Sequence, residues 1–374
     1  IVATTSQEPS SPIADQSILT LDLSEEITDA KPKLDPSEVV GQALSGDESA
    51  RSIALRSVLE SVEKAATDDR IVGLYLYGSL DPTSSGFATL REVRQALEKF
   101  RDSGKPIYAY DRESWQERDY YLASVANQVI QNPGSTLEMN GFSLENAFFA
   151  GALQKYGIGI QVLRVGKYKS AVEPFTRTSS SPENKEQTQK LLTDLWNDFR
   201  TAAATSRKLT VDKIQTIADQ QAVLLPSEAQ AAGLIDKVAY EDEIVAELEK
   251  LTGQDTDTHS FRQISMGEYA DAIDLEHARN SENRVAVVYA EGEIVNGFGS
   301  TRSIGGESLV ETLREVRQDD QIKAVVLRVN SPGGSASASE QIAREVLLTT
   351  KVKPVIVSMG NYAASGGYQI STFA

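Results

Sequence analysis

The chain repeats its own pattern at a spacing of about 250 residues, and this internal repeat constrains the fold more than any other feature. Both copies follow the order strand, helix, buried strand, turn, helix, buried strand. Val/Ile-rich strands separated by helices are typical of parallel sheets with crossover helices, so we predict an α/β protein with two tandem domains. The matching segments are 18-ILTLDLSEEI-27 with 285-VAVVYAEGEI-294, 68-DDRIVGLYLYG-78 with 319-DDQIKAVVLRVN-330, and 105-KPIYAYDRESWQERDYYLAS-124 with 353-KPVIVSMGNYAASGGYQIST-372.

The repeat divides the 374 residues into two domains with a connecting region. We predict a flexible segment over 1–16, a first domain over 17–180, a helical connection and linker over 181–260, and a second domain over 261–374. Ser181 followed by Pro182 is typical of a helix start. A stripe of apolar residues at helical spacing then predicts a core-facing side: Leu191, Leu192, Leu195, Trp196 and Phe199. The first residue is not Met and no stop signal precedes Ala374, so we expect a processed or cropped chain.

Composition excludes several classes of protein. A net charge of −17 disfavours nucleic-acid binding and docking on anionic lipid. The chain has no cysteine, which excludes disulfides, thiol catalysis and cysteine zinc sites. No apolar run reaches the roughly 18 residues that a membrane span needs.

The two copies differ where chemistry is expected. The second copy has 331-SPGGSASAS-339 where the first has 81-DPTSSGFAT-89, and it has Ser365 where the first has Glu117. The first copy therefore kept the scaffold and lost the adjacent glycines and the serine. This pattern favours a chemical role for the groups that only the second copy carries.

These groups have the layout of an acyl-transfer site. Gly333 and Gly334 follow a buried strand, and Ser365 follows the next strand at the start of a helix. Neighbouring parallel strands end at the same edge of a sheet, where α/β proteins bind ligands. The backbone N–H groups of Gly366 and Gly333 would then flank the Ser365 hydroxyl and form an oxyanion hole.

A serine nucleophile needs a base, and the chain has only two histidines. His259 lies in a polar linker and His277 in an acidic helical stretch, so we expect both to be solvated. A lysine can serve instead if its amine is neutral at the working pH. In 162-VLRVGKYKSAVEPF-175 we predict a strand into Gly166, followed by Lys167 and Lys169. The residues alone do not choose between these lysines or separate them from surface charge.

Three motifs in order, VGKYKSAVEPF, NSPGGS and MGNYAASGGYQIST, resemble signal peptide peptidase A of the long, tandem-domain type. That family belongs to the Clp protease and crotonase fold group. The resemblance runs from Ser17 to the end of the chain. It implies Ser365 as nucleophile, Lys169 rather than Lys167 as general base, and the backbones of Gly366 and Gly333 as oxyanion donors.

The resemblance also implies an ATP-independent endopeptidase that degrades cleaved signal peptides. It would be associated with an inner or thylakoid-type membrane and assemble as a homo-oligomer, a tetramer in the long form. We expect no cofactor, no metal ion and no nucleic acid. One active site per pair of domains follows, formed within a chain or between subunits. The small residues beside the nucleophile, Ala363 and Ala364, predict a preference for apolar peptide side chains.

Two alternatives stay open from the sequence. One is a crotonase-type acyl-CoA enzyme, in which carboxylates act as acid and base and Glu117 is a conceivable acid. The other is a non-catalytic scaffold of the same fold. A fluorophosphonate probe separates the peptidase from both, because only the peptidase loses its label in Ser365→Ala.

Overall fold

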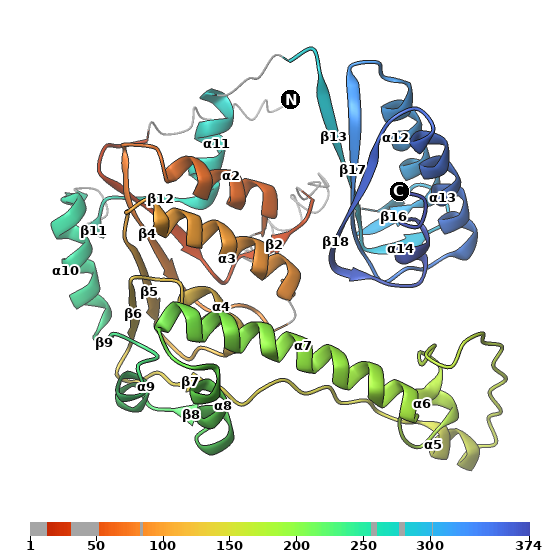
Figure 1. The fold of residues 1–374 in the computed structure, drawn as a ribbon, viewed down its shortest axis with the longest axis horizontal. Coiled ribbons are helices and arrows are strands. Elements are labelled where there is room, and N and C mark those ends of the chain that lie inside the picture. Colours follow the sequence, from red (N-terminus) through yellow and green to blue (C-terminus); the bar gives the residue numbers. More distant parts are fainter. Residues whose placement is uncertain (1–12, 31–51, 83–84, 256–259, 277–280, 301) are drawn as a thin grey trace, which may run out of the picture.

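The computed structural model describes residues 13–30, 52–82, 85–255, 260–276, 281–300 and 302–374. His259, His277, Thr83 and Ser84 lie outside these ranges, as does most of the predicted flexible segment over 1–16. Within the described residues the predicted fold class is confirmed, with two α/β domains built on parallel sheets (Figure 1).

The first domain is built on a six-stranded parallel sheet in the order β12-β1-β4-β5-β6-β9. Its central strands are rich in Ile, Leu, Val and Tyr and are buried on both faces, as expected for parallel strands between helices. The strands are β1 (Ser17–Asp22), β4 (Ile71–Tyr77), β5 (Ile107–Asp111), β6 (Gln128–Gln131), β9 (Lys237–Val238) and β12 (Gln263–Ser265).

Helices cover both faces of this sheet. One core joins the strands to α2 (Leu55–Ala65), α3 (Phe87–Asp102), α4 (Glu117–Ala123) and α11 (Met266–Glu276). On the other face, α10 (Glu241–Thr252) packs through Ile244 and Leu248 against Tyr75 and Tyr110. Shorter helices α8 (Val211–Gln220) and α9 (Pro226–Ala232) complete the first core, together with the small pair β7 (Leu137–Glu138) with β8 (Val223–Leu224). The pair β10 (Gln254–Asp255) with β11 (Ser260–Phe261) lies on the α10 face, where Phe261 is buried.

The second domain has a smaller sheet in the order β13-β17-β18, also parallel. Its core lies between the strands and α12 and α13. The opposite face carries exposed apolar side chains, among them Val285 and Ile356, so β18 is less buried than the sequence predicts. The elements are β13 (Arg284–Glu291), β14 (Glu293–Val295), β15 (Gly299–Ser300), β16 (Ser303–Gly305), α12 (Gly306–Gln318), β17 (Ile322–Ser331), α13 (Ala336–Thr350), β18 (Val355–Ala363) and α14 (Gly366–Gln369).

Matching contacts recur in the two copies. Lys105, before β5, donates hydrogen bonds from Nζ to the carbonyls of Ala65 and Asp68, both at 2.7 Å. Lys353, before β18, donates in the same way to the carbonyls of Val316 and Asp319. The small parallel pair β2 (Glu26–Thr28) with β3 (Ser52–Ala54) likewise corresponds to β14 with β16. The duplication seen in the sequence therefore extends to individual side-chain contacts.

The domain limits differ from those the sequence predicts. Strand β12 pairs with β1, and α11 packs on α2, so residues 263–276 belong to the first domain. Strand β9, inside the predicted connecting region, pairs with β6 of the first sheet. The second sheet begins only at Arg284. The apolar runs in these segments are short, and their partners lie far away in the sequence.

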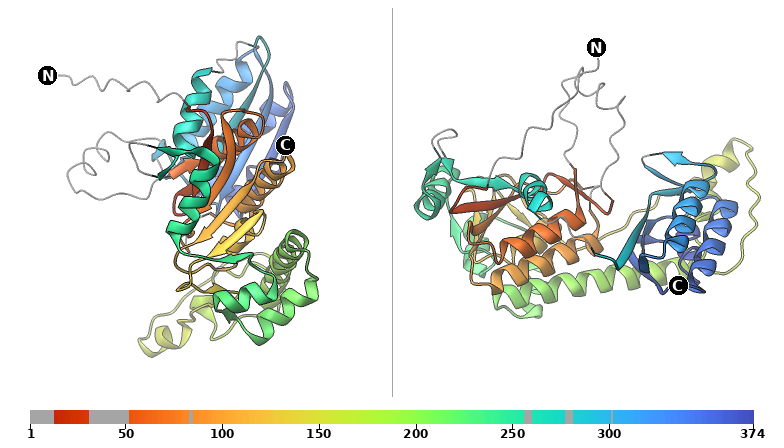
Figure 2. Two further views of the ribbon diagram at one scale, coloured as in Figure 1. Left: turned by 90° about the vertical axis from the view of Figure 1, so that its left-hand side faces the viewer. Right: turned by 90° about the horizontal axis from the view of Figure 1, so that it is seen from above.

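An arm projects from the first domain, and we define it as residues 140–195. It carries α5 (Ala150–Lys155), α6 (Glu173–Thr176) and the first half of α7 (Pro182–Arg207). Figures 1 and 2 show the chain running out along α7, with α5 and α6 at the far end. Ser181 is the predicted N-cap, and its Oγ accepts from the Asn184 N–H at 3.1 Å.

The predicted core-facing stripe of α7 is only partly correct. Phe199 is fully buried and Trp196 packs at the edge of the core, but Leu191 is 55% exposed. The helix begins in the arm and reaches the core only with its second half. Helical spacing identifies an apolar side but does not show how far the core extends along it.

Candidate active site

The candidate nucleophile lies on a strained turn. Strand β18 ends at Ala363, and α14 begins at Gly366 with Ser365 as its N-cap. Ser365 has φ +49° and ψ −118°, a backbone conformation that residues with a side chain rarely adopt. Such strain costs about 1–3 kcal/mol and is concentrated at functional sites. Ser365 is exposed to solvent, whereas the next two residues, Gly366 and Gly367, are buried.

The glycine turn after β17 packs against this serine turn. Gly333 has φ +95°, and a Cβ atom added to it would lie 2.6 Å from the Gly366 nitrogen and 2.8 Å from the Ser365 Cβ. A side chain at position 333 therefore has no room. A Cβ on Gly366 would likewise meet Ser339 Oγ at 2.3 Å. The structure thus brings together three of the predicted site residues, Gly333, Ser365 and Gly366.

The two predicted oxyanion donors differ in their present partners. Within the described part of the chain, the Gly366 N–H at the start of α14 has no hydrogen-bond acceptor. The Gly333 N–H donates to Ser331 Oγ at 3.1 Å, and that hydroxyl donates to the Gly292 carbonyl at 2.6 Å. The geometry therefore favours Gly366 as the donor that is ready to bind an oxyanion. Ser331, which begins the SPGG motif, is buried and supports the glycine turn, a role that its position in the motif does not indicate.

Lys169 lies in the arm. The strand predicted before it is wrong, because residues 157–165 are irregular and a turn at Gly166, with φ +89°, precedes the lysine. The Lys169 side chain is exposed, and among the described residues its amine has no hydrogen bond or ion pair. In Figure 1 the neighbouring α6 lies well apart from α14. Among the described residues, no hydrogen bond or ion pair joins Lys169 to Ser365 within one chain.

The backbone around Lys169 is held by two groups that the sequence analysis missed. Arg164 Nη1 donates to the Lys169 carbonyl at 3.1 Å and lies 3.7 Å from Glu173 Oε1. Glu173 is 1% exposed, and its Oε2 accepts from the Ser181 N–H at 2.9 Å. The acid of the VEPF sequence thus ties α6 to the start of α7. This role depends on contacts that the spacing of the residues does not indicate.

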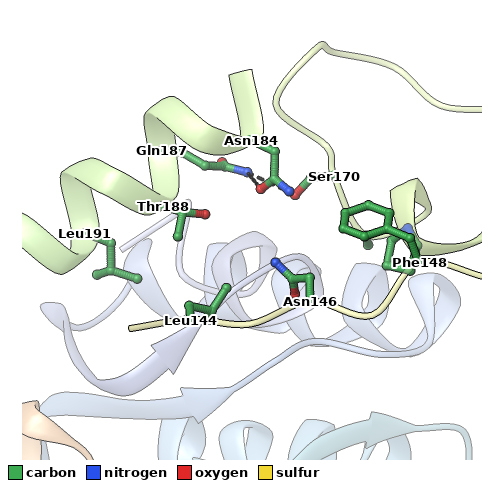
Figure 3. Close-up of a pocket in the computed structure, with 10 residues that line it drawn as sticks. Leu144, Asn146, Phe148, Ser170, Asn184, Gln187, Thr188 and Leu191 are labelled. Carbon is green, nitrogen blue, oxygen red and sulfur yellow. Dashed lines mark hydrogen bonds between the residues drawn. The ribbon is translucent and has the colours of Figure 1, made fainter. Parts of the chain in front are cut away.

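A cavity of about 530 Å³ opens next to Lys169 in the arm (Figure 3). It lies between the extended segment 144–148, the residues that follow Lys169, and the first turns of α7. The Gln187 side chain donates to Ser170 Oγ at 2.9 Å and closes one side. Its volume is in the range of small-molecule and peptide side-chain pockets. Its walls include Leu144, Phe148, Ala171, Pro174 and Leu191.

The residue of the first domain that matches Ser365 is Glu117, and its carboxylate already has a hydrogen-bond partner. Glu117 begins α4, is 6% exposed, and accepts from the Gly141 N–H at 2.7 Å. Burial raises the pKa of its carboxyl. The carboxylate therefore has a structural partner in this domain, and its contact does not favour the crotonase alternative.

The strained serine and the contacting glycine turn, at one edge of a parallel sheet in a duplicated α/β fold, fit a serine hydrolase. Residues 99–255 match the family model described as peptidase family S49. The chain is 36% identical over 345 residues to "Protease 4" of Haemophilus influenzae, a match that covers 88% of this chain and 55% of that protein. It is 33% identical to "Protease 4" of Salmonella typhi, over 95% of this chain and 58% of that protein.

A plant protein, "Serine protease SPPA, chloroplastic" of Arabidopsis thaliana, is 33% identical over 86% of this chain and 48% of its own length. Most of the chain is therefore similar to the protease 4 and SppA peptidases, and its residues 99–255 match peptidase family S49. It spans about half the length of the curated relatives that it matches. Among the described residues, no helix combines the length and the hydrophobicity required to cross a membrane.

Proposed function

We propose that this protein is a serine endopeptidase that uses Ser365 as nucleophile and Lys169 as general base. The observation that carries the proposal is the Ser365 turn itself, with its strained backbone, its exposed side chain and the unpaired N–H of Gly366 beside it. The family match and the protease relatives support the class of reaction. The dyad assignment rests on the motif around Lys169 and on the lack of histidine in the matched motifs.

The reaction proceeds in two balanced steps. Ser365 Oγ attacks the carbonyl carbon of the peptide bond while the Lys169 amine takes the hydroxyl proton. The negative charge moves to the carbonyl oxygen, where the Gly366 N–H donates to it, and Gly333 contributes if its N–H turns from Ser331 Oγ. The Lys169 ammonium then protonates the departing amine as the C–N bond breaks. Water, deprotonated by the same lysine, attacks the acyl ester, and the lysine ammonium returns the proton to Ser365 Oγ as the C–Oγ bond breaks.

We propose further that the site is completed between two copies of the chain, as part of a homo-oligomer such as a tetramer. The arm carries a dense group of exposed apolar side chains, and a soluble surface rarely leaves such a group uncovered. Covering the arm would also remove water from around the Lys169 amine. The exposed arm residues are Leu144, Phe149, Tyr156, Ile158, Ile160, Leu163, Val165, Tyr168, Phe175 and Leu191.

The proposed substrates are apolar peptides such as cleaved signal peptides, degraded without ATP at an inner or thylakoid-type membrane. The small residues before Ser365, Ala363 and Ala364, leave room beside the nucleophile, and the cavity next to Lys169 has partly apolar walls. Peptides with Leu or Ala before the cut bond should be cleaved faster than peptides with Asp. Equal rates would contradict this substrate class.

Two inactive variants test the dyad and its location together. Ser365→Ala and Lys169→Ala should each lose turnover and labelling by a fluorophosphonate, whereas the matched control Lys167→Ala should keep both. Co-expression of the two inactive chains should restore activity if the dyad forms between copies, because each supplies the group that the other lacks. A dyad within one chain gives no restoration. Full activity of Ser365→Ala would overturn the proposal.

A further inference from the structure

A side chain of the second domain caps a helix of the first domain. Asn361 Oδ1 accepts from the N–H groups of Ala88 and Thr89 at 3.1 and 3.2 Å, and its Nδ2 donates to Thr89 Oγ1 at 3.0 Å. Ala88 and Thr89 are the second and third residues of α3, which are the donors that an N-cap side chain normally satisfies. Asn361 therefore acts as the cap of a helix about 270 residues away in the chain.

The N-cap position of α3 in the first domain has no side chain of its own, so the Asn361 side chain fits there. The N-cap residue of α3 is Gly86, which has no side chain to accept from the helix. Its φ of −81° is ordinary, so glycine is not required by the backbone. A Cβ on Gly86 would instead lie 2.5 Å from Asn361 Cγ and Oδ1, so glycine is required by the close approach of Asn361.

The corresponding helix of the second domain is capped locally. Ser335 precedes α13, and its Oγ accepts from the Ala338 N–H at 3.3 Å. Its counterpart in the first domain, Ser85, instead bonds to both backbone groups of Ile27. The first copy thus lost its own cap, and the second domain supplies a replacement. A chance contact would not explain the missing cap and the missing Cβ together.

Asn361 is also placed to control the nucleophile. It lies four positions before Ser365, in a bulge of β18. Met359 pairs with Val329 and Ala363 pairs with Ser331, so three residues of β18 lie opposite one residue of β17. Bulges beside active sites commonly direct a side chain to a particular place. The segment that ends in Ser365 is therefore anchored to α3 in the middle of its bulge.

The anchor continues from α3 to the helix that leads out of the arm. Arg94 of α3 is buried and donates to the Ala202 carbonyl at 2.9 Å and to Ser206 Oγ at 2.6 Å, both on α7. Beside the cap, Arg328 of β17 pairs with Asp29 and with Glu92 of α3, each at 2.8 Å. The contacts join the Ser365 segment to α3 and α3 to α7.

We infer that Asn361 is a positioning residue for the reaction, which holds the Ser365 turn in place by anchoring it to α3 of the first domain. This inference rests on the proposed function. Among the described residues, the Asn361 side chain bonds to α3 and not to Ser365, so it acts through the bulge. Its loss should slow attack by Ser365 more than it weakens substrate binding. A displacement of about 1 Å at a reacting group can lower the rate on the order of 100-fold.

The test uses the intact protein and four variants. Asn361→Ala should lower kcat and the fluorophosphonate labelling rate by about 10- to 100-fold with little change in KM. Asn361→Asp should keep most of the rate, because a carboxylate accepts from the same two N–H groups and Thr89 Oγ1 can turn to donate. Gly86→Ala should reproduce the loss by displacing Asn361. Thr210→Ala removes the comparable cap of α8, whose Oγ1 accepts from the Lys213 N–H at 3.1 Å, and should leave kcat unchanged.

A second measurement keeps this inference separate from the proposed function. Amide hydrogen exchange of residues 364–370 should accelerate in Asn361→Ala and not in Thr210→Ala. Unchanged exchange there, or kcat equal to that of the unaltered protein, would overturn the positioning role. If neither the unaltered protein nor Ser365→Ala is labelled, the proposed peptidase fails, while the exchange measurement still decides whether Asn361 holds the turn. If Thr210→Ala lowers kcat as much as Asn361→Ala does, Asn361 only stabilises the fold and does not position Ser365.

Discussion

The starts of α4 and α14 occupy the same position in the two copies and are used in opposite ways. In the first domain, Glu117 is buried and accepts from the N–H of Gly141, the second residue of the arm. In the second domain, Ser365 is exposed on a strained turn against Gly333. One copy thus uses the position to anchor the arm that carries Lys169, and the other uses it to present a hydroxyl. After the duplication, each domain therefore carries a different part of one proposed site: the first carries Lys169 on its arm, and the second carries Ser365.

The largest effect is expected from filling the space between the two turns of the second domain. Gly333→Ala places a methyl group against the Gly366 nitrogen and Ser365 Cβ at a positive φ. We expect a loss of about 2–4 kcal/mol from overpacking and backbone strain together. Labelling of Ser365 should fall by about 100-fold or more as the turn moves.

A matched glycine of the first domain separates the two causes. Gly104 has φ +91°, and a Cβ there would meet nothing within 4 Å. Gly104→Ala should therefore cost only the backbone strain, about 1–2 kcal/mol, without loss of labelling. Thermal unfolding and probe labelling measure both variants. Similar losses in the two variants would show that the turns do not depend on their close contact.

A second difference lies in β5 and β18. The last residue of β5 is Asp111, and the matching residue of β18 is Met359. Burial raises the pKa of the Asp111 carboxyl from 3.8 to about 6. The folded protein therefore binds more protons than the unfolded chain between these pH values, so this group makes the protein less stable as pH rises from about 4 to about 6. At about 1.4 kcal/mol per pH unit, the cost at pH 7 is about 3 kcal/mol.

Asp111→Asn should remove this cost. Gln131 Nε2 now donates to Asp111 Oδ2 at 2.7 Å, while Gln131 Oε1 is buried with no partner among the described residues. A turned Gln131 amide can therefore accept from the new Asn. The variant should be more stable than the unaltered protein at pH 7, by up to about 3 kcal/mol, and equal to it near pH 4. Tryptophan fluorescence during urea unfolding follows the first domain, because both tryptophans, Trp115 and Trp196, lie outside the second. A constant difference across pH would contradict the shifted carboxyl.

The anchor at Glu117 is expected to have a smaller effect. Glu117→Ala leaves the Gly141 N–H without its acceptor and should cost about 1–3 kcal/mol. Glu117→Gln keeps an acceptor oxygen and removes a carboxyl whose pKa is raised by burial, so it should be neutral or stabilising at pH 7. Hydrogen exchange should speed up at residues 140–145 in the alanine variant only. Faster exchange in both variants would show that the charge, and not the acceptor, holds the arm.

The sequence was sufficient to predict the duplicated α/β fold, because apolar runs and matched turns are local patterns. It was also sufficient to place Ser365 beside Gly333, since parallel strands end at one sheet edge. It did not predict the arm, whose apolar residues are exposed in one chain, and it assigned a strand where residues 157–165 are irregular. Asn361 was missed because its partners, Ala88 and Thr89, are backbone groups, which leave no mark on the residue pattern.

The smallest effect, and the most direct test of the duplication, concerns the paired lysines. Lys105 donates to two carbonyls near the C-terminal end of α2, and Lys353 to two near the C-terminal end of α12. Replacing either by Met keeps the apolar part of the side chain and removes the ammonium, so each change should cost about 1 kcal/mol. Lys105→Met should speed hydrogen exchange in α2 and β5, and Lys353→Met should do so in α12 and β18. If either variant loosens both domains equally, the two copies do not unfold as separate units, and the interdomain contacts of Asn361 and Arg328 join them into one.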